Sequence, residues 1–189
     1  AAIRQMVNDE RNLITLEDPV EIELPGVAQV QIQEKIGMSF SAGLRSALRQ
    51  DPDVIMVGEI RDQITAELAV RAALTGHLVL STLHTNDSAS AVIRLVEMGV
   101  PNYLVASSLT LSMAQRLVRR PCSECAIRQP ADADTRSRLG MTGAEGAVCL
   151  AAVGCRACGM TGYSGRVGLY EMLPISRAVR SALMGGEGE

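Results

Sequence analysis

Residues 48–62 read LRQDPDVIMVGEIRD, and this stretch decides which fold we expect. Its middle, Val54–Val57, is a short apolar run that is rich in β-branched residues and precedes Gly58 and Glu59. Such a run between turn residues is typical of a strand buried on both faces of a parallel sheet. An acid that directly follows such a strand lies at the edge where open α/β sheets bind ligands. Glu59 is therefore a candidate site residue, although the pattern also fits a core strand followed by an ordinary surface acid.

Two further stretches repeat this arrangement of a short apolar run followed by polar residues. Asn12–Leu16 is followed by Glu17 and Asp18, and His77–Leu83 leads into His84–Asn86. The carboxyl ends of parallel strands meet at one edge of a sheet, so these polar groups are expected to lie near Glu59. Acids and a histidine gathered at that edge form an arrangement typical of an active site.

Helical patterns separate and follow the three predicted strands, which indicates an α/β fold with right-handed crossovers. Ser39 or Ser41 is expected to cap the first of these helices. This first helix is expected to end near Arg49, and the later ones to cover Ile64–Leu74, Ala89–Met98 and Leu104–Val118. The stretch Val20–Gln33 has a Pro-Gly turn signal in its middle and is predicted to form a hairpin or a pair of short edge strands. Further on, we expect a strand at Val167–Leu173, a short helix from Ser176 to Leu183, and a disordered tail.

The composition is that of an ordinary globular protein with an aliphatic core. Of the 189 residues, 47% are hydrophobic and 21% are charged, and there are only one Phe, three Tyr and no Trp. A net charge of −3 and the scarcity of aromatic side chains argue against a nucleic-acid surface. No apolar run approaches the length that spans a bilayer, so we expect no membrane span.

Four of the five cysteines form two C-x-x-C pairs, Cys122 with Cys125 and Cys155 with Cys158. Two such pairs can supply the four thiolates of a tetrahedral, structural Zn²⁺ site. Redox pairs and disulfides are the alternatives, and the presence of two pairs favours zinc. The gap between the pairs is long enough for a small subdomain, and Cys149 is predicted to be a buried or free thiol.

Taken together, these motifs resemble a known family, the secretion ATPases that power type II secretion and type IV pilus assembly. LRQDPDVIMVGEIRD resembles the family signature, Leu13–Glu21 its Asp box, and Thr75–Asp87 its His box. The segments AQRL at Ala114–Leu117 and GYSGRVGLYEMLP at Gly162–Pro174, like the two cysteine pairs, also fall where the family has them. The cysteine pairs resemble the assembly and type II branches rather than the retraction branch.

The resemblance implies a partial RecA-like P-loop NTPase core, with helices on both faces of a parallel sheet and a small tetracysteine zinc subdomain. It implies a ring hexamer at the cytoplasmic side of the inner membrane that uses ATP and Mg²⁺ to drive a membrane platform protein. Glu59 would then polarise the attacking water, Glu17 and Asp18 would organise magnesium and water, and His84 would contact the γ-phosphate. Family motifs also contain three arginines that could contact phosphates or neighbouring subunits: Arg49, Arg61 and Arg116.

The family's phosphate loop, G-x-x-x-x-G-K-[ST], does not occur anywhere in this sequence. That loop holds the β- and γ-phosphates, so we expect the chain to be a fragment that begins after it and is inactive alone. The expected parts are an ATPase core at 1–118, a zinc subdomain with a strand at 119–175, and a C-terminal helix and tail at 176–189. The alternative is a catalytically inactive, zinc-stabilised interaction module or degenerate subunit.

Overall fold

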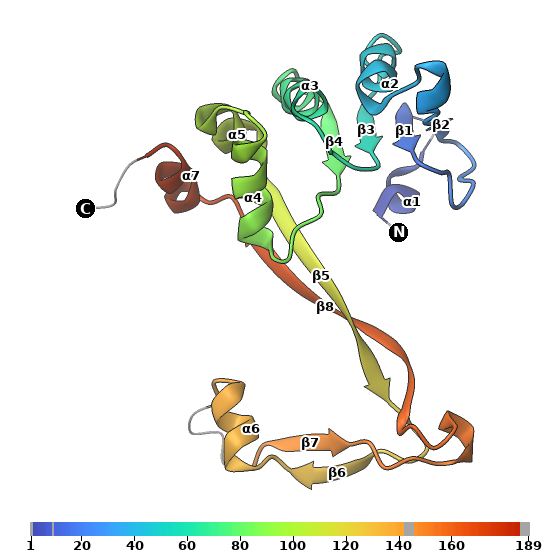
Figure 1. The fold of residues 1–189 in the computed structure, drawn as a ribbon, viewed down its shortest axis with the longest axis vertical. Helices are drawn as coiled ribbons and strands as arrows, with labels where there is room; N and C mark the ends of the chain where they lie inside the picture. Colours follow the sequence, from blue (N-terminus) through green and yellow to red (C-terminus); the bar gives the residue numbers. More distant parts are fainter. Residues whose placement is uncertain (1, 9, 142–145, 186–189) are drawn as a thin grey trace. The chain divides into compact units, whose positions relative to one another are not determined.

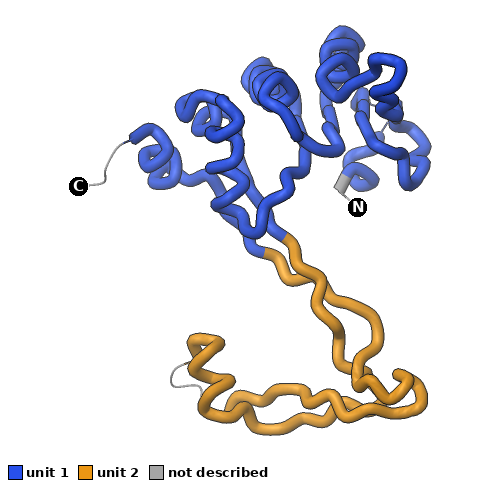
Figure 2. Tube along the Cα trace, in the orientation of Figure 1, with its two compact units in different colours: residues 1–114, 171–189 blue, residues 115–170 orange. Residues whose placement is uncertain are grey.

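The structure, a computed structural model, describes residues 2–8, 10–141 and 146–185. Its contacts divide the chain into two compact units, residues 1–114 with 171–189, and residues 115–170 (Figure 2). The first unit contains the sheet and the helices that position the candidate site. The second unit contains all five cysteines.

A four-stranded parallel sheet forms the centre of the first unit, with strand order β2-β1-β3-β4 (Figure 1). These strands are β1 (Leu13–Glu17), β2 (Ala28–Gln31), β3 (Val54–Val57) and β4 (Leu78–Ser81). The register pairs Leu16 of β1 with Val57 of β3, and Val57 in turn with Ser81 of β4. The three strands predicted from apolar runs are thus confirmed, and their carboxyl ends are level with one another.

Helices pack on both faces of this sheet, as predicted. On one face, Leu16 and Ile55 are completely buried against α2 and α3 together with Leu44 of α2. On the other face, Ile3 of the short helix α1 packs against Leu13 and Val54. The helices of this unit are α1 (Ala2–Met6), η1 (Glu34–Ile36), α2 (Phe40–Ala47), α3 (Gln63–Leu74), α4 (Ser88–Glu97), α5 (Asn102–Ser108) and α7 (Arg177–Leu183). Among the described residues, no helix is both long and apolar enough to cross a membrane.

Polar side chains begin these helices as the sequence indicates. Ser39 accepts a hydrogen bond from the Ala42 amide at the start of α2, and Ser176 caps α7. α7 belongs to the first unit because Val179 and Leu183 pack against its core. The last four residues of the tail that we expected to be disordered, 186–189, lie outside the described residues.

The predicted hairpin at Val20–Gln33 is wrong. β2 is an edge strand, but it pairs in parallel with β1 and not with residues that precede Pro25. The Pro-Gly signal does mark a turn, at Gly26 with its left-handed backbone (φ 81°). Pairing with the buried strand β1 therefore outweighs the local hairpin signal.

The predicted helix at Leu104–Val118 is also wrong beyond Ser108. The chain is extended at Leu109 and continues as β5 (Leu111–Pro121), which pairs with β8 (Tyr163–Pro174). The partner strand lies far away in the sequence, so the local apolar spacing contains no sign of it. The strand predicted at Val167–Leu173 is part of β8, and the two strands form a long ribbon (Figure 1).

The second unit is small and has almost no buried side chains. Besides the outer parts of β5 and β8, it contains β6 (Ile127–Pro130), α6 (Ala133–Arg138), β7 (Val148–Ala151) and η2 (Arg156–Cys158). β6 and β7 pair in antiparallel fashion. Only Cys122 and Gly162 are buried among its described residues. Apolar packing therefore contributes little to the stability of this unit.

Candidate functional site

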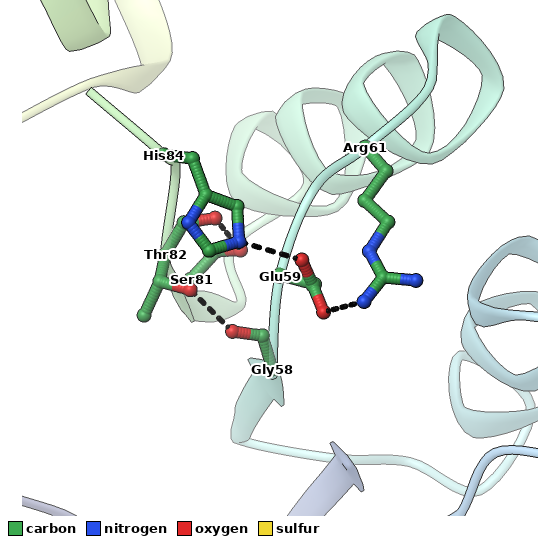
Figure 3. A network of polar contacts seen from close by, with 6 residues as sticks. All are labelled: Gly58, Glu59, Arg61, Ser81, Thr82 and His84. Carbon is green, nitrogen blue, oxygen red and sulfur yellow. Dashed lines mark hydrogen bonds and ion pairs between the residues drawn. The ribbon is translucent and has the colours of Figure 1, made fainter. Parts of the chain in front are cut away.

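The carboxyl edge of the sheet brings Glu59, Arg61 and His84 into contact (Figure 3). His84 Nε2 lies 3.0 Å from Glu59 Oε2, and Arg61 Nη2 donates to Glu59 Oε1 over 2.5 Å. Both oxygens of the carboxylate are thus engaged. Only 13% of the Glu59 side chain is exposed, whereas 85% of the His84 side chain is exposed and therefore able to reach a ligand.

The charge of Glu59 is stabilised by its two neighbours. The hydrogen bond from Arg61 is the largest effect that lowers the pKa of Glu59 below its ordinary value of 4.5, and His84 acts in the same direction. Partial burial opposes this shift. The pKa of Arg61 is raised in turn by Glu59 and, more weakly, by the negative charge of Asp18. The site therefore holds an ionised carboxylate at neutral pH, a group that can orient water or a cation.

Backbone contacts between neighbouring strand ends fix the position of Glu59. The Gly58 amide donates to Leu16 O over 2.7 Å, and a Cβ at Gly58 would lie only 2.9 Å from the same oxygen. Glycine is therefore required for this close approach. On the other side, Thr82 Oγ1 donates to Gly58 O over 2.6 Å, and the Ile60 amide donates to Thr82 O. Residues 58–60 are thus held between β1 and the segment after β4.

Glu17 and Asp18 lie at the same edge but differ in their surroundings. Glu17 Oε1 accepts hydrogen bonds from Thr15 Oγ1 at 2.6 Å and from Gln29 Nε2 at 2.9 Å. It therefore belongs to the face of β1 that packs toward α1, because side chains alternate along a strand. Asp18 lies within electrostatic range of Arg61. Asp18 is thus the member of this pair that is linked to the Glu59 cluster.

The other two arginines named from the sequence belong to other elements, the end of α2 and the strand β5. Arg49 follows α2, one residue before Gln50, whose carbonyl oxygen accepts from Asn12 Nδ2. Asn12 precedes β1, so Arg49 belongs to the opposite, amino-terminal edge of the sheet. Arg116 is exposed on β5 and falls in the second unit.

Arg94 is a residue of this site that the sequence did not reveal. Two shallow depressions adjoin His84, one toward Thr85 and the other toward Arg61, and Arg94 lines both. Arg94 is half exposed and pairs with Glu97 at 3.4 Å. In the sequence, only its place four residues after Ser90, on the same face of a predicted helix, connects Arg94 with this site. Ordinary surface arginines have the same kind of place, so the sequence alone did not single it out. Arg94 adds a positive charge beside the imidazole.

The four paired cysteines of the second unit form one cluster. Their sulfur atoms all lie within 4.8 Å of one another. Cys158 Sγ is 3.9 Å from Cys125 Sγ and 3.8 Å from Cys155 Sγ. A disulfide requires about 2.05 Å, whereas sulfurs bound tetrahedrally to Zn²⁺ at about 2.3 Å are roughly 3.8 Å apart. These residues therefore fit a closed, four-thiolate zinc site, and Cys149 on β7 is outside it.

Backbone amides around the cluster favour thiolates. The Cys155 and Gly162 amides each donate to Cys158 Sγ at 3.2 Å, and they lower the pKa of this thiol to about 6. Burial, followed by the neighbouring sulfurs, raises the pKa of Cys125 to about 11. Crowded sulfurs resist ionisation together unless a cation offsets their charge, as a metal would.

Comparison with known proteins identifies several relatives over the whole chain. A family model described as "Type II/IV secretion system protein" matches residues 1–189. The chain is 50% identical over 189 residues to "Type II secretion system protein E" of Klebsiella pneumoniae, covering 100% of this chain and 38% of that protein. It is 46% identical over 187 residues to "Type IV pilus assembly ATPase PilB" of Thermus thermophilus, covering 98% of this chain and 21% of that protein. The chain thus spans well under half the length of these relatives.

Solved structures agree with this result. The crystal structure of the pilus retraction motor PilT with bound ADP matches with a TM-score of 0.65 and 31% identity, over 94% of this chain and 42% of that one. The ATPase DotB of Legionella pneumophila matches with a TM-score of 0.64 and 28% identity, over 98% of this chain and 43% of that one.

Proposed function

Because the chain belongs to the family of type II/IV secretion system proteins, we propose that it forms part of a motor that hydrolyses ATP. The similarity to secretion motors also confirms the expected fold class, a partial RecA-like core with a tetracysteine subdomain. The motor would power type II secretion or type IV pilus assembly. The observation that supports this function best is the ionised Glu59, held by Arg61 and His84 at the carboxyl edge of the sheet.

In this proposal Glu59 orients and polarises the water that attacks the γ-phosphate. Phosphoryl transfer depends mainly on positioning and on compensation of charge, and an ionised carboxylate suits that task. His84 and Arg61 occupy both oxygens of Glu59 in the structure. We therefore infer that His84 turns from Glu59 to the γ-phosphate when ATP is bound, which frees Oε2 for the water.

Asp18 and Glu17 would hold Mg²⁺ or waters of its coordination shell. Carboxylate oxygens are ligands that Mg²⁺ prefers, and the cation offsets the charge of the phosphates. Asp18 lies beside the Glu59 cluster, as the effect of its charge on Arg61 indicates. Glu17 accepts hydrogen bonds from Thr15 and Gln29, so it would bind Mg²⁺ directly only if those hydrogen bonds broke. Otherwise Asp18 would be the ligand and Glu17 would act only as its neighbour.

Other parts of the full-length protein would supply the phosphate-binding groups. No G-x-x-x-x-G-K-[ST] string occurs in these 189 residues, so its amides and lysine are not available here. We therefore expect residues 1–189 alone to bind ATP weakly. The alternative function, a zinc-stabilised module without catalysis, is favoured by the same observation and predicts that the full-length protein does not hydrolyse ATP.

The remaining parts of the proposal rest on the family. The motor would act as a hexameric ring at the cytoplasmic side of the inner membrane and would drive a membrane platform protein. Within it, Arg49 and Arg116 would contact neighbouring subunits or phosphates. The cysteine cluster would hold a structural Zn²⁺ through Cys122, Cys125, Cys155 and Cys158, because its sulfur spacing fits a tetrahedron.

The test is the substitution Glu59→Gln in the full-length protein. It keeps the shape of the side chain but removes its charge, so ATP turnover should fall by at least about a hundredfold while ATP binding persists. Glu23→Gln, an exposed acid on the loop before β2, is the matched control and should leave turnover unchanged. Turnover at the wild-type rate in Glu59→Gln would remove Glu59 from the mechanism.

A further inference from the structure

A carboxylate of the ribbon contacts the start of helix α4. Glu171 Oε1 on β8 accepts hydrogen bonds from the Ser88 amide at 3.1 Å and from Ser88 Oγ. Ser112 Oγ on β5 donates to Ser88 O over 2.7 Å. Only 2% of Ser88 and 7% of Ser112 is exposed. Three polar groups of one buried serine are thus bound by two strands that are distant from it in the sequence.

These contacts exceed what the helix needs in order to begin. α4 already has the side-chain cap Asp87, which accepts from the Ser90 amide at 2.6 Å and from Ser90 Oγ at 2.8 Å. A single cap of this kind begins α3, where Asp62 accepts from the Thr65 amide. A carboxylate near a helix N-terminus interacts favourably with the helix dipole. The additional hydrogen bonds from Glu171 and Ser112 fix where α4 begins relative to the ribbon.

The same serine is one end of the segment that contains His84. At its other end, Thr82 is bound to Gly58 and Ile60 beside Glu59. Between these anchors the Thr85 amide donates to Leu83 O at 3.0 Å, and Thr85 Oγ1 donates to Asp87 O at 3.3 Å. The segment is therefore short, tightened by internal hydrogen bonds, and fixed at both ends. Movement of either end would displace the imidazole.

We propose that Glu171, assisted by Ser112, is a positioning residue that sets the location of His84 relative to Glu59. This inference rests on the proposed function, because His84 has a task only if the motor hydrolyses ATP. It gives a role to the segment Gly162–Pro174, which includes Glu171. It also implies that β5 and β8, the strands that continue into the second unit, are connected to the catalytic edge through one buried serine.

The first measurement is ATP turnover by the full-length protein with Glu171→Ala. The substitution removes the acceptor of two hydrogen bonds, and displacement of a catalytic group by about 1 Å can cost up to a hundredfold in rate. We expect kcat to fall by about tenfold with little change in KM. Glu171→Gln keeps an acceptor oxygen and should restore most of the activity. Met172→Ala, a 59% exposed neighbour on the same strand, is the matched control and should behave like the wild type.

The decisive measurement is a double-mutant cycle with His84→Ala. If Glu171 acts through His84, adding Glu171→Ala to His84→Ala should reduce kcat no further, so the two effects are not additive. A purely structural role would give multiplied losses and a lowered melting temperature, and that result would overturn the inference. Wild-type kcat in Glu171→Ala would overturn it too. A wild-type protein that does not hydrolyse ATP would instead refute the proposed function itself. Ser112→Ala, a smaller change, provides the same comparison if Glu171→Ala does not fold.

Discussion

Removal of one cysteine from the cluster should unfold the second unit and leave the first intact. We choose Cys122→Ser, because Cys122 is the most buried of the four sulfur ligands, with 2% of its surface exposed. Cys149→Ser is the matched control, since Cys149 lies in the same unit on β7 but outside the cluster. The two variants make the same chemical change in the same part of the fold.

The burial of side chains indicates how strongly the folding of the second unit depends on the metal. A fully buried Leu or Val contributes about 1.5–3 kcal/mol, and no described residue larger than Cys122 is buried in 115–170. A structural Zn²⁺ contributes an apparent binding free energy of about 10–16 kcal/mol, which becomes folding free energy in a small unit. The free energy of folding that is lost with one thiolate should therefore be larger than the stabilisation that the remaining side-chain packing provides. The first unit has its own core of buried residues around Leu16, Leu44 and Ile55 and should stay folded.

Metal content and limited trypsin digestion together measure the outcome. Elemental analysis should find one zinc per chain in the wild type and in Cys149→Ser, and none in Cys122→Ser. Exposed trypsin sites lie within the second unit at Arg128, Arg156 and Arg166. Rapid cleavage at these sites, identified by mass spectrometry, should appear in Cys122→Ser or after chelation, while peptides of the first unit remain protected.

Two results would refute the reasoning. A wild-type protein without metal that still resists trypsin at residues 115–170 would show that the unit is stable on its own. Equal zinc content and equal resistance in Cys122→Ser and Cys149→Ser would show that the cluster does not hold the metal.

Three further predictions concern the first unit. Arg61→Ala removes the largest effect that lowers the pKa of Glu59, so this pKa should rise toward 4.5. Because the ionised carboxylate is the active form, the acid limb of the pH–rate profile should move to higher pH, and an unmoved limb would contradict the assignment. Leu44→Ala leaves a cavity in place of a completely buried side chain and should lower the free energy of unfolding by about 2–5 kcal/mol, as measured by chemical denaturation. Ile36→Ala, at a residue that is 75% exposed, is its control and should change stability by less than about 0.5 kcal/mol. Asn12→Ala removes the donor to Gln50 O (2.7 Å) and should cost about 0.5–1.5 kcal/mol, whereas Asn12→Asp, which also lacks the donor, should not restore stability.

The sequence by itself determined the local features of this protein. The apolar runs around Leu16, Val57 and Leu80 identified three parallel strands, because short apolar runs bounded by turn or polar residues are typical of strands in a parallel sheet. The polar residues that follow these runs include Glu59 and His84, which the sequence placed close together because parallel strands end at one edge of the sheet. The structure brings their side chains into contact. The spacing of the two C-x-x-C pairs identified the cysteine cluster, because a tight turn places two sulfurs on one side.

Only the tertiary structure decided features that depend on partners distant in the sequence. The segment after Ser108 has helical spacing, yet it forms β5 because β8, more than forty residues later, satisfies its backbone hydrogen bonds. Glu17 is turned toward Thr15 and Gln29 by the alternation of side chains along β1. The contact between Glu171 and Ser88 joins residues 83 positions apart and has no local signature. The periodicity of apolar residues indicates which residues are buried. Hydrogen-bond partners that are distant in the sequence depend instead on the tertiary arrangement of the chain.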